Sequence, residues 1–77
     1  MNNLELATDL ILGCELTLLN KKNNEYNLAR VERLGDSDYL YILSIPHWDG
    51  HHEVLGVCKV DPDNPIKSVL ECLNQLF

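Results

Sequence analysis

The sequence predicts a single α+β domain over residues 1–77, with a helix, four antiparallel strands and a second helix in that order. Three features carry this prediction. Asp49-Gly50 lies between two β-rich runs and favours a tight hairpin turn, because both residues tolerate positive φ. Residues 14–20 alternate apolar and polar side chains as a strand does, and residues 65–77 carry an apolar stripe at helical spacing. Short turns favour a meander of the strands, with both helices packed on one face of the sheet.

Two segments leave a choice between helix and strand. Residues 3–13 place most apolar side chains at helical spacing, but Leu6 and Leu12 lie off that stripe. We expect a helix there. Residues 26–34 contain tyrosine and valine, which favour a strand, together with alanine, arginine and glutamate, which suit a helix. We expect a strand, because turn-forming residues flank this segment on both sides.

The C-terminal helix is the clearest element. Asn64 is a good N-cap, and Pro65 suits the first helical position, where its missing N–H costs nothing. A helix of this length is marginal alone in water, so its apolar side is expected to dock on the sheet. That side consists of Ile66, Val69, Leu70, Leu73, Leu76 and Phe77.

The central hairpin is predicted to have two apolar faces. With a two-residue turn, Tyr41 faces Cys58, and at the tip His47 faces His52 and Trp48 faces His51. A sheet with one solvated face alternates apolar and polar residues along each strand, and this hairpin does not. Two short helices cover only one face. The other face is therefore expected to meet a partner or to be shielded by long side chains.

We predict that this exposed face binds a protein. Extending the strand pairing places Arg30 and Glu32 beside Tyr39 and Tyr41, and tyrosine with arginine is more typical of an interface than of a core. A homodimer is the expected assembly. Together with the hairpin tip, the predicted partner-binding residues are Tyr39, Tyr41, Arg30, Glu32, Trp48 and His51.

The hairpin tip offers a second hypothesis, a metal-binding module. Three histidines and two acidic residues fall within residues 47–53, and imidazole and carboxylate groups bind zinc or nickel. The spacing fits no standard site, and the predicted hairpin turns His51 away from the other two histidines. We therefore expect no cofactor. The residues of the alternative metal site are His47, His51 and His52.

The charge of the chain argues against direct nucleic-acid binding and supports a third hypothesis. The chain has 12 acidic and 6 basic residues, a net charge of −6, whereas phosphate binding needs clustered lysine and arginine. The predicted turns bring Asp36 and Asp38 to the same end of the sheet as Asp61 and Asp63. This acidic cluster would suit an inhibitor of a nucleic-acid-handling enzyme. Aspartate also favours turns for purely local reasons.

The three cysteines bear on chemistry and location. Cys14, Cys58 and Cys72 form no CxxC pair and are predicted to be free thiols, which, without a targeting or membrane segment, indicates a cytoplasmic protein. A nucleophilic cysteine needs a base nearby, and the predicted topology keeps the histidines far from Cys58. An enzyme is not expected. The first hypothesis is a non-enzymatic protein-interaction module, with inhibitor, adaptor and chaperone roles left open.

Overall fold

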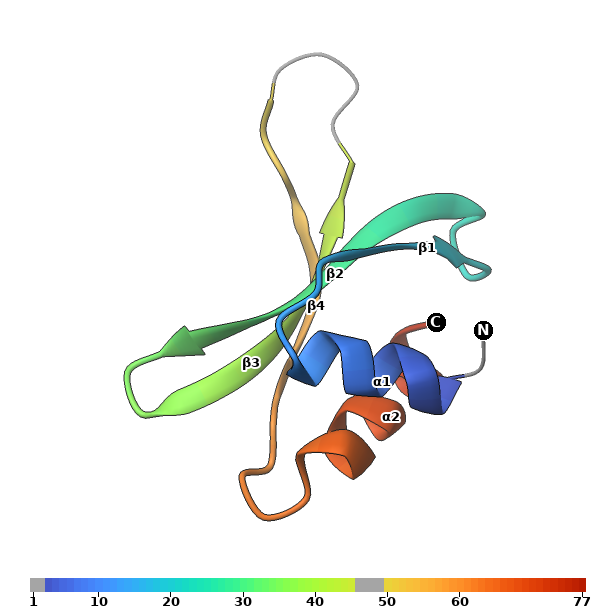
Figure 1. The fold of residues 1–77 in the computed structure, drawn as a ribbon. Coiled ribbons are helices and arrows are strands. Elements are labelled where there is room, and N and C mark those ends of the chain that lie inside the picture. Colours follow the sequence, from blue (N-terminus) through green and yellow to red (C-terminus); the bar gives the residue numbers. More distant parts are fainter. Residues whose placement is uncertain (1–2, 46–49) are drawn as a thin grey trace.

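The computed structural model describes residues 3–45 and 50–77 and confirms the predicted fold class. Its strands form one antiparallel sheet in the order β1-β2-β3-β4, and both helices lie on the same side of it (Figure 1). The two ambiguous segments resolve as expected, into a helix and a strand. In the described residues the elements are α1 (Asn3–Ile11), β1 (Leu16–Asn20), β2 (Glu25–Leu34), β3 (Ser37–Ser44), β4 (Val54–Lys59) and α2 (Pro65–Leu76).

Local signals explain where the helices begin and end. The chain leaves α1 at Gly13, whose φ of 97° is open to glycine and costly for other residues. α2 begins at Pro65 as predicted, but the side chain of Asn64 makes no capping hydrogen bond. Instead the Ser68 hydroxyl accepts the Asp61 N–H at 2.9 Å and donates to the Pro65 carbonyl at 3.0 Å. This serine therefore ties the incoming chain to the first turn of α2.

A group of asparagines shapes the turn between β1 and β2. Oδ1 of Asn27 accepts hydrogen bonds from the side-chain amides of Asn20 at 3.0 Å and Asn23 at 3.2 Å. Oδ1 of Asn20 accepts the Lys22 N–H at 3.0 Å. Asn24 has a φ of 58°, which asparagine tolerates better than most residues. Because Asn20 and Asn27 are buried, these bonds offset the cost of removing their amides from water.

The register of the β3–β4 hairpin differs by one residue from the sequence-based prediction. Tyr41 pairs with Val57 rather than with Cys58, and Cys58 pairs with Leu40. The prediction counted from a two-residue turn at Asp49-Gly50, whereas both strands stop several residues short of that position. Since paired residues share a face of an antiparallel sheet, Cys58 moves to the helix-covered face and Val57 to the opposite one.

A β-bulge further interrupts the pairing of β3 with β4. Ile42 pairs with Gly56, but the next residue, Leu43, pairs with Val54, which leaves Leu55 as the extra residue on β4. The predicted turn and the predicted pairings at the tip involve residues 46–49, which lie outside the described part of the chain.

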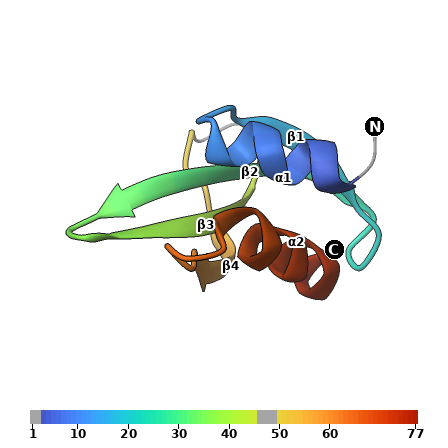
Figure 2. The ribbon, with the colours of Figure 1, turned by 60° about the horizontal axis from the view of Figure 1, so that its bottom comes forward.

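The hydrophobic core lies between the sheet and the two helices, which pack against each other and against one face of the strands (Figure 2). The sheet supplies small and branched side chains, and the helices supply the stripes that their sequences predict. None of the helices in residues 3–45 and 50–77 is long and apolar enough to span a membrane. The buried core consists of Ala7, Leu10, Ala29, Leu40, Ile42, Val60, Val69, Cys72 and Leu73.

Two contacts hold α2 against the edge strand β4. A Cβ on Gly56 would lie 3.0 Å from Cδ2 of Leu76, so the absence of a side chain there lets α2 approach closely. Two residues further on, Cys58 forms a disulfide with Cys72, with Cα atoms 6.3 Å apart. The prediction of three free thiols is therefore wrong. Cys14, which is exposed, is the one free cysteine among the described residues.

Candidate interaction surface

The face of the sheet opposite the helices gathers the four strand residues that the sequence predicted to bind a partner. Ala29, Leu40 and Ile42 are buried in the core, so the residues that alternate with them point the other way. We call this surface the open face. Its large or charged residues are Leu19, Tyr26, Leu28, Arg30, Glu32, Leu34, Tyr39, Tyr41, Leu43, Val54, Val57 and Lys59.

Two cross-strand rows form the centre of the open face. The rings of Tyr39 and Tyr41 lie side by side on β3, with centroids 6.5 Å apart and planes tilted by 51°. Both tyrosines are half-buried, and each has one neighbour on β2 and one on β4. We call these the Tyr39 row (Glu32, Tyr39, Lys59) and the Tyr41 row (Arg30, Tyr41, Val57).

Arg30 has two carboxylates beside it. Its Nε lies 2.9 Å from Oε1 of Glu32, and its Nη1 lies 3.5 Å from Oε2 of Glu15. Nε is buried and donates no hydrogen bond to a described atom, so the contact with Glu32 is an ion pair without hydrogen-bond alignment. Both carboxylates are about half exposed, which keeps the pairs weak individually. Together they neutralise the guanidinium, and its stem can lie against Tyr41.

Glu15 was missed as a neighbour of this site. The pairing of Leu16 with Ala29 places Glu15 opposite Arg30 when the β1–β2 register is extended by one residue. The signal is present in the sequence, because Glu15 is a polar position of the alternating segment 14–20, but that alternation does not specify which strand lies beside it.

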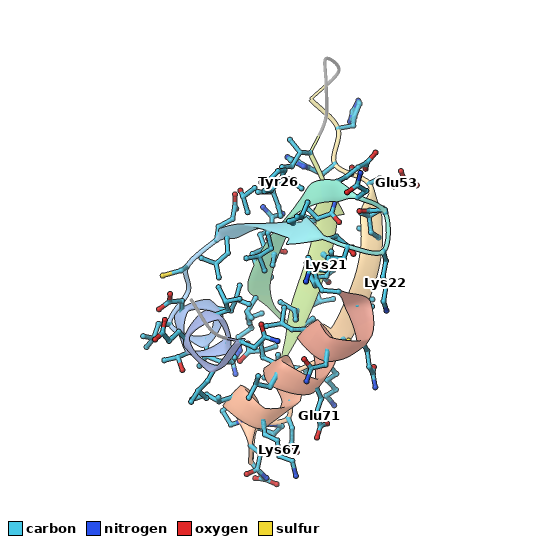
Figure 3. All side chains as sticks on the ribbon, turned by 90° about the vertical axis from the view of Figure 1, so that its right-hand side faces the viewer. Lys21, Lys22, Tyr26, Glu53, Lys67 and Glu71 are labelled. Carbon is cyan, nitrogen blue, oxygen red and sulfur yellow. A yellow bond between two sulfur atoms is a disulfide. The ribbon has the colours of Figure 1, made fainter. Side chains whose placement is uncertain are left out.

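Apolar side chains remain exposed around the two rows. Tyr26 is 60% exposed, Val54 55% and Val57 50%. Leu43 also lies on the open face and is buried there, although it is not part of the core beneath the helices. Its neighbours on the open face therefore shield some apolar surface from water. Figure 3 shows Tyr26 near the end of the molecule opposite Lys67 and Glu71 of α2. Exposed apolar side chains beside charged and tyrosine residues are typical of an interaction site.

The hairpin tip is described only in part. His51 and His52 are exposed, and Nδ1 of His52 donates to the Ser44 carbonyl at 2.7 Å. The predicted partner-binding residue Trp48 lies outside the described residues, as does His47 of the alternative metal site. Within the described part, no group of three or more metal-ligating side chains converges. The metal site stays a prediction, because it needs His47.

The four predicted acidic residues belong to two segments that meet at one end of the sheet. The Val60 N–H donates to the Asp38 carbonyl at 2.8 Å, which brings the turn containing Asp36 beside the segment containing Asp61 and Asp63. One of these carboxylates has a local role. Oδ1 of Asp61 accepts the Asp63 N–H at 2.9 Å, as aspartate commonly does in turns.

Arg33 offsets one of the carboxylates at this end. Nε of Arg33 lies 3.3 Å from Oδ1 of Asp38. Arg33 and Lys59 also line, with Asp36 and Asp38, a groove of about 310 Å³. The end of the sheet is thus mixed in charge.

A cleft that the sequence did not indicate lies between α1, β1 and the end of α2. Its volume is about 290 Å³. Asn3 Nδ2 donates to Oδ1 of Asn74 at 3.1 Å, and Nζ of Lys22 donates to the Gln75 carbonyl. These bonds join three segments that are distant in sequence, which is why no local pattern revealed the cleft. Its walls are Leu6, Leu18, Leu19, Leu73 and Phe77, with Asn3, Lys21 and Asn74 among them.

Comparison of the chain with protein-family profiles, with curated proteins and with solved structures finds no match. The functional argument therefore rests on the geometry of the open face.

Proposed function

We propose that the chain is a non-enzymatic protein-interaction module that binds a protein partner through the open face. The observation that carries this proposal is the pairing of Arg30 with Tyr41 and of Glu32 with Tyr39 on a face that neither α1 nor α2 covers. Tyrosine and arginine are enriched where interfaces are most strongly stabilised, because they combine a large contact area with polar groups. Val54 and Val57 supply exposed apolar surface beside them.

The chemistry of the chain favours a protein over a nucleic acid as partner. The net charge of −6 opposes a phosphate backbone, and the carboxylates of Glu15 and Glu32 already neutralise Arg30. Two of the three cysteines are joined in a disulfide, which removes them as nucleophiles. Inhibitor, adaptor and chaperone roles all use such a surface. The hairpin tip, with Trp48 and His51, is a further part of the proposed site.

Affinity capture with matched variants tests the proposal. The wild-type chain, Tyr41→Ala, Val57→Lys and Glu71→Ala are each used as bait, and bound proteins are identified by mass spectrometry. Glu71 lies on α2, far from the open face, and serves as the control (Figure 3). A protein that binds wild type and Glu71→Ala but neither open-face variant supports the proposal. Equal capture by all four baits, with unchanged melting temperatures, contradicts it.

The cytoplasmic location predicted from the sequence is also part of this proposal, and the disulfide bears on it. Disulfides persist mainly in oxidising compartments. Fractionation of the producing cell tests the location separately from the bond. Recovery of the chain in the cytosolic fraction supports a cytoplasmic location, and recovery in a secreted or other oxidising compartment contradicts it.

A further inference from the structure

We propose that the partner of the open face includes a second copy of this chain, packed sheet on sheet about a two-fold axis that runs along β3. This inference rests on the proposed function, because it assigns an occupant to the same surface. Antiparallel sheets pack in this way with their strands within about 30° of each other. The argument starts from the distribution of charge across the Tyr39 row.

The Tyr39 row is self-complementary. Glu32 lies on one side of Tyr39 and Lys59 on the other, on neighbouring strands. A two-fold axis along β3 exchanges the two sides of the sheet, so Lys59 of each copy would face Glu32 of the other. Tyr39 would lie on the axis. Two symmetry-related ion pairs, each between Lys59 of one copy and Glu32 of the other, would therefore form across the interface. These pairs fix the relative position of the copies.

The charges needed for these pairs are available. Within the described part of the chain, the Lys59 ammonium has no carboxylate at ion-pair distance. Arg30 contacts Oε1 of Glu32, and this leaves Oε2 open to a second cation. Lys59 is exposed, and the Glu32 side chain is 49% exposed, so both can be reached from outside.

The Tyr41 row is also compatible with a two-fold axis along β3. Tyr41 would lie on Tyr41 of the other copy, and Val57 would face the neutralised guanidinium of Arg30. Arginine packed on apolar and aromatic side chains is common at interfaces, provided that its charge is paired. Val57, now 50% exposed, would gain the cover that neither helix provides.

The size of the surface predicts a weak dimer. With the axis on β3, the strands β2, β3 and β4 of the two copies overlap. Three strands about 4.8 Å apart with a mean length of about 27 Å offer roughly 400 Å² per copy, so a dimer would bury roughly 800 Å², which is below the size of a stable interface and in the range of weak, transient ones. The edge of β4 is a poorer alternative. Its bulge at Leu55 and its charged Lys59 are features that oppose pairing of edge strands.

Charge reversal tests this arrangement by sedimentation velocity. Wild type is measured from about 5 to about 500 µM, a range that brackets the association expected of so small an interface. In Lys59→Glu and in Glu32→Lys, each homodimer would contain two contacts between like charges. We expect either substitution to weaken self-association by about tenfold or more. An equimolar mixture of the two variants restores both opposite-charge pairs and should associate within about threefold of wild type.

Two variants on α2 control for net charge. Lys67→Glu matches Lys59→Glu, and Glu71→Lys matches Glu32→Lys, and both positions are exposed on α2 (Figure 3). The inference is overturned by a wild type that is monomeric at the highest concentration, by controls as impaired as the open-face variants, or by a mixture that associates no better than its components. A monomeric wild type whose captured partner is still lost on Tyr41→Ala overturns the dimer and leaves the proposed function standing.

Discussion

Breaking the disulfide between Cys58 and Cys72 is expected to cause a large loss of stability. The bond joins residues 14 positions apart and so closes a loop of 15 residues, from 58 to 72 inclusive. In the chain-entropy account, opening a loop of this size costs about 3 kcal/mol at 25 °C. A domain of 77 residues is typically stable by about 4–12 kcal/mol, so the bond contributes a substantial share. The corresponding fall in melting temperature is about 12–24 °C.

Thermal unfolding followed by circular dichroism measures this loss. The wild-type chain is compared with and without a reducing agent, and with the double variant Cys58→Ala/Cys72→Ala, in which the thiols cannot re-form the bond. Cys14→Ser is the control, because Cys14 is exposed and outside the disulfide. If reduction lowered the melting temperature by less than about 3 °C, the loop-closure reasoning would be refuted for this protein. An intact mass that showed no loss of two hydrogens would refute the bond itself.

Three further predictions concern the fold. Leu40→Ala, at a fully buried site, should cost about 2–5 kcal/mol of unfolding free energy in urea, whereas Leu34→Ala, at a site 66% exposed, should change it by about 0.5 kcal/mol or less. Equal effects would place Leu40 outside the core. Asn27→Ala should cost about 1–3 kcal/mol, because the buried amide of Asn20 loses its acceptor. A neutral result would mean that water replaces that acceptor. Gly35→Ala should destabilise by about 1 kcal/mol, since φ there is 65°, and a stabilised variant would contradict the left-handed turn.

The elements whose signals are local could be predicted from the sequence. Pro65 and the apolar stripe that follows it define α2 within one residue. The residues at the centre of the open face could also be predicted, because the pairing of β2 with β3 depends on a local turn. A turn at Gly35 joins β2 to β3 directly, and a short turn fixes the register of two antiparallel strands. Arg30 and Glu32 therefore had to lie beside Tyr41 and Tyr39, whatever happened elsewhere in the chain.

The disulfide could not be predicted, because it depended on a register that the sequence does not specify. Counting from Asp49-Gly50 placed Cys58 opposite Tyr41, on the face away from the helices, where Cys72 of α2 cannot reach it. The observed register differs by one residue over residues 56–59, and such a shift moves these side chains of β4 to the other face, whereas the bulge at Leu55 keeps Val54 on the open face. Nothing in the alternation of apolar residues marks the bulge at Leu55, because both faces of β4 carry apolar residues.

The same one-residue difference determines what the open face can bind. In the predicted register that face would have presented Cys58 and Val60 next to the tyrosines, an apolar strip with no charge. In the observed register it presents Val57 and Lys59. Lys59 adds a positive charge to the Tyr39 row, which already contains the negative charge of Glu32. The opposite side of β4 then meets α2 through Gly56 and the Cys58 disulfide. On its inner side β4 is joined to α2 by the Cys58 disulfide, and on its outer side it presents Lys59. Both depend on the same strand register. A slip of β4 that exposed Cys58 would break the anchor and remove Lys59 from the proposed interface together.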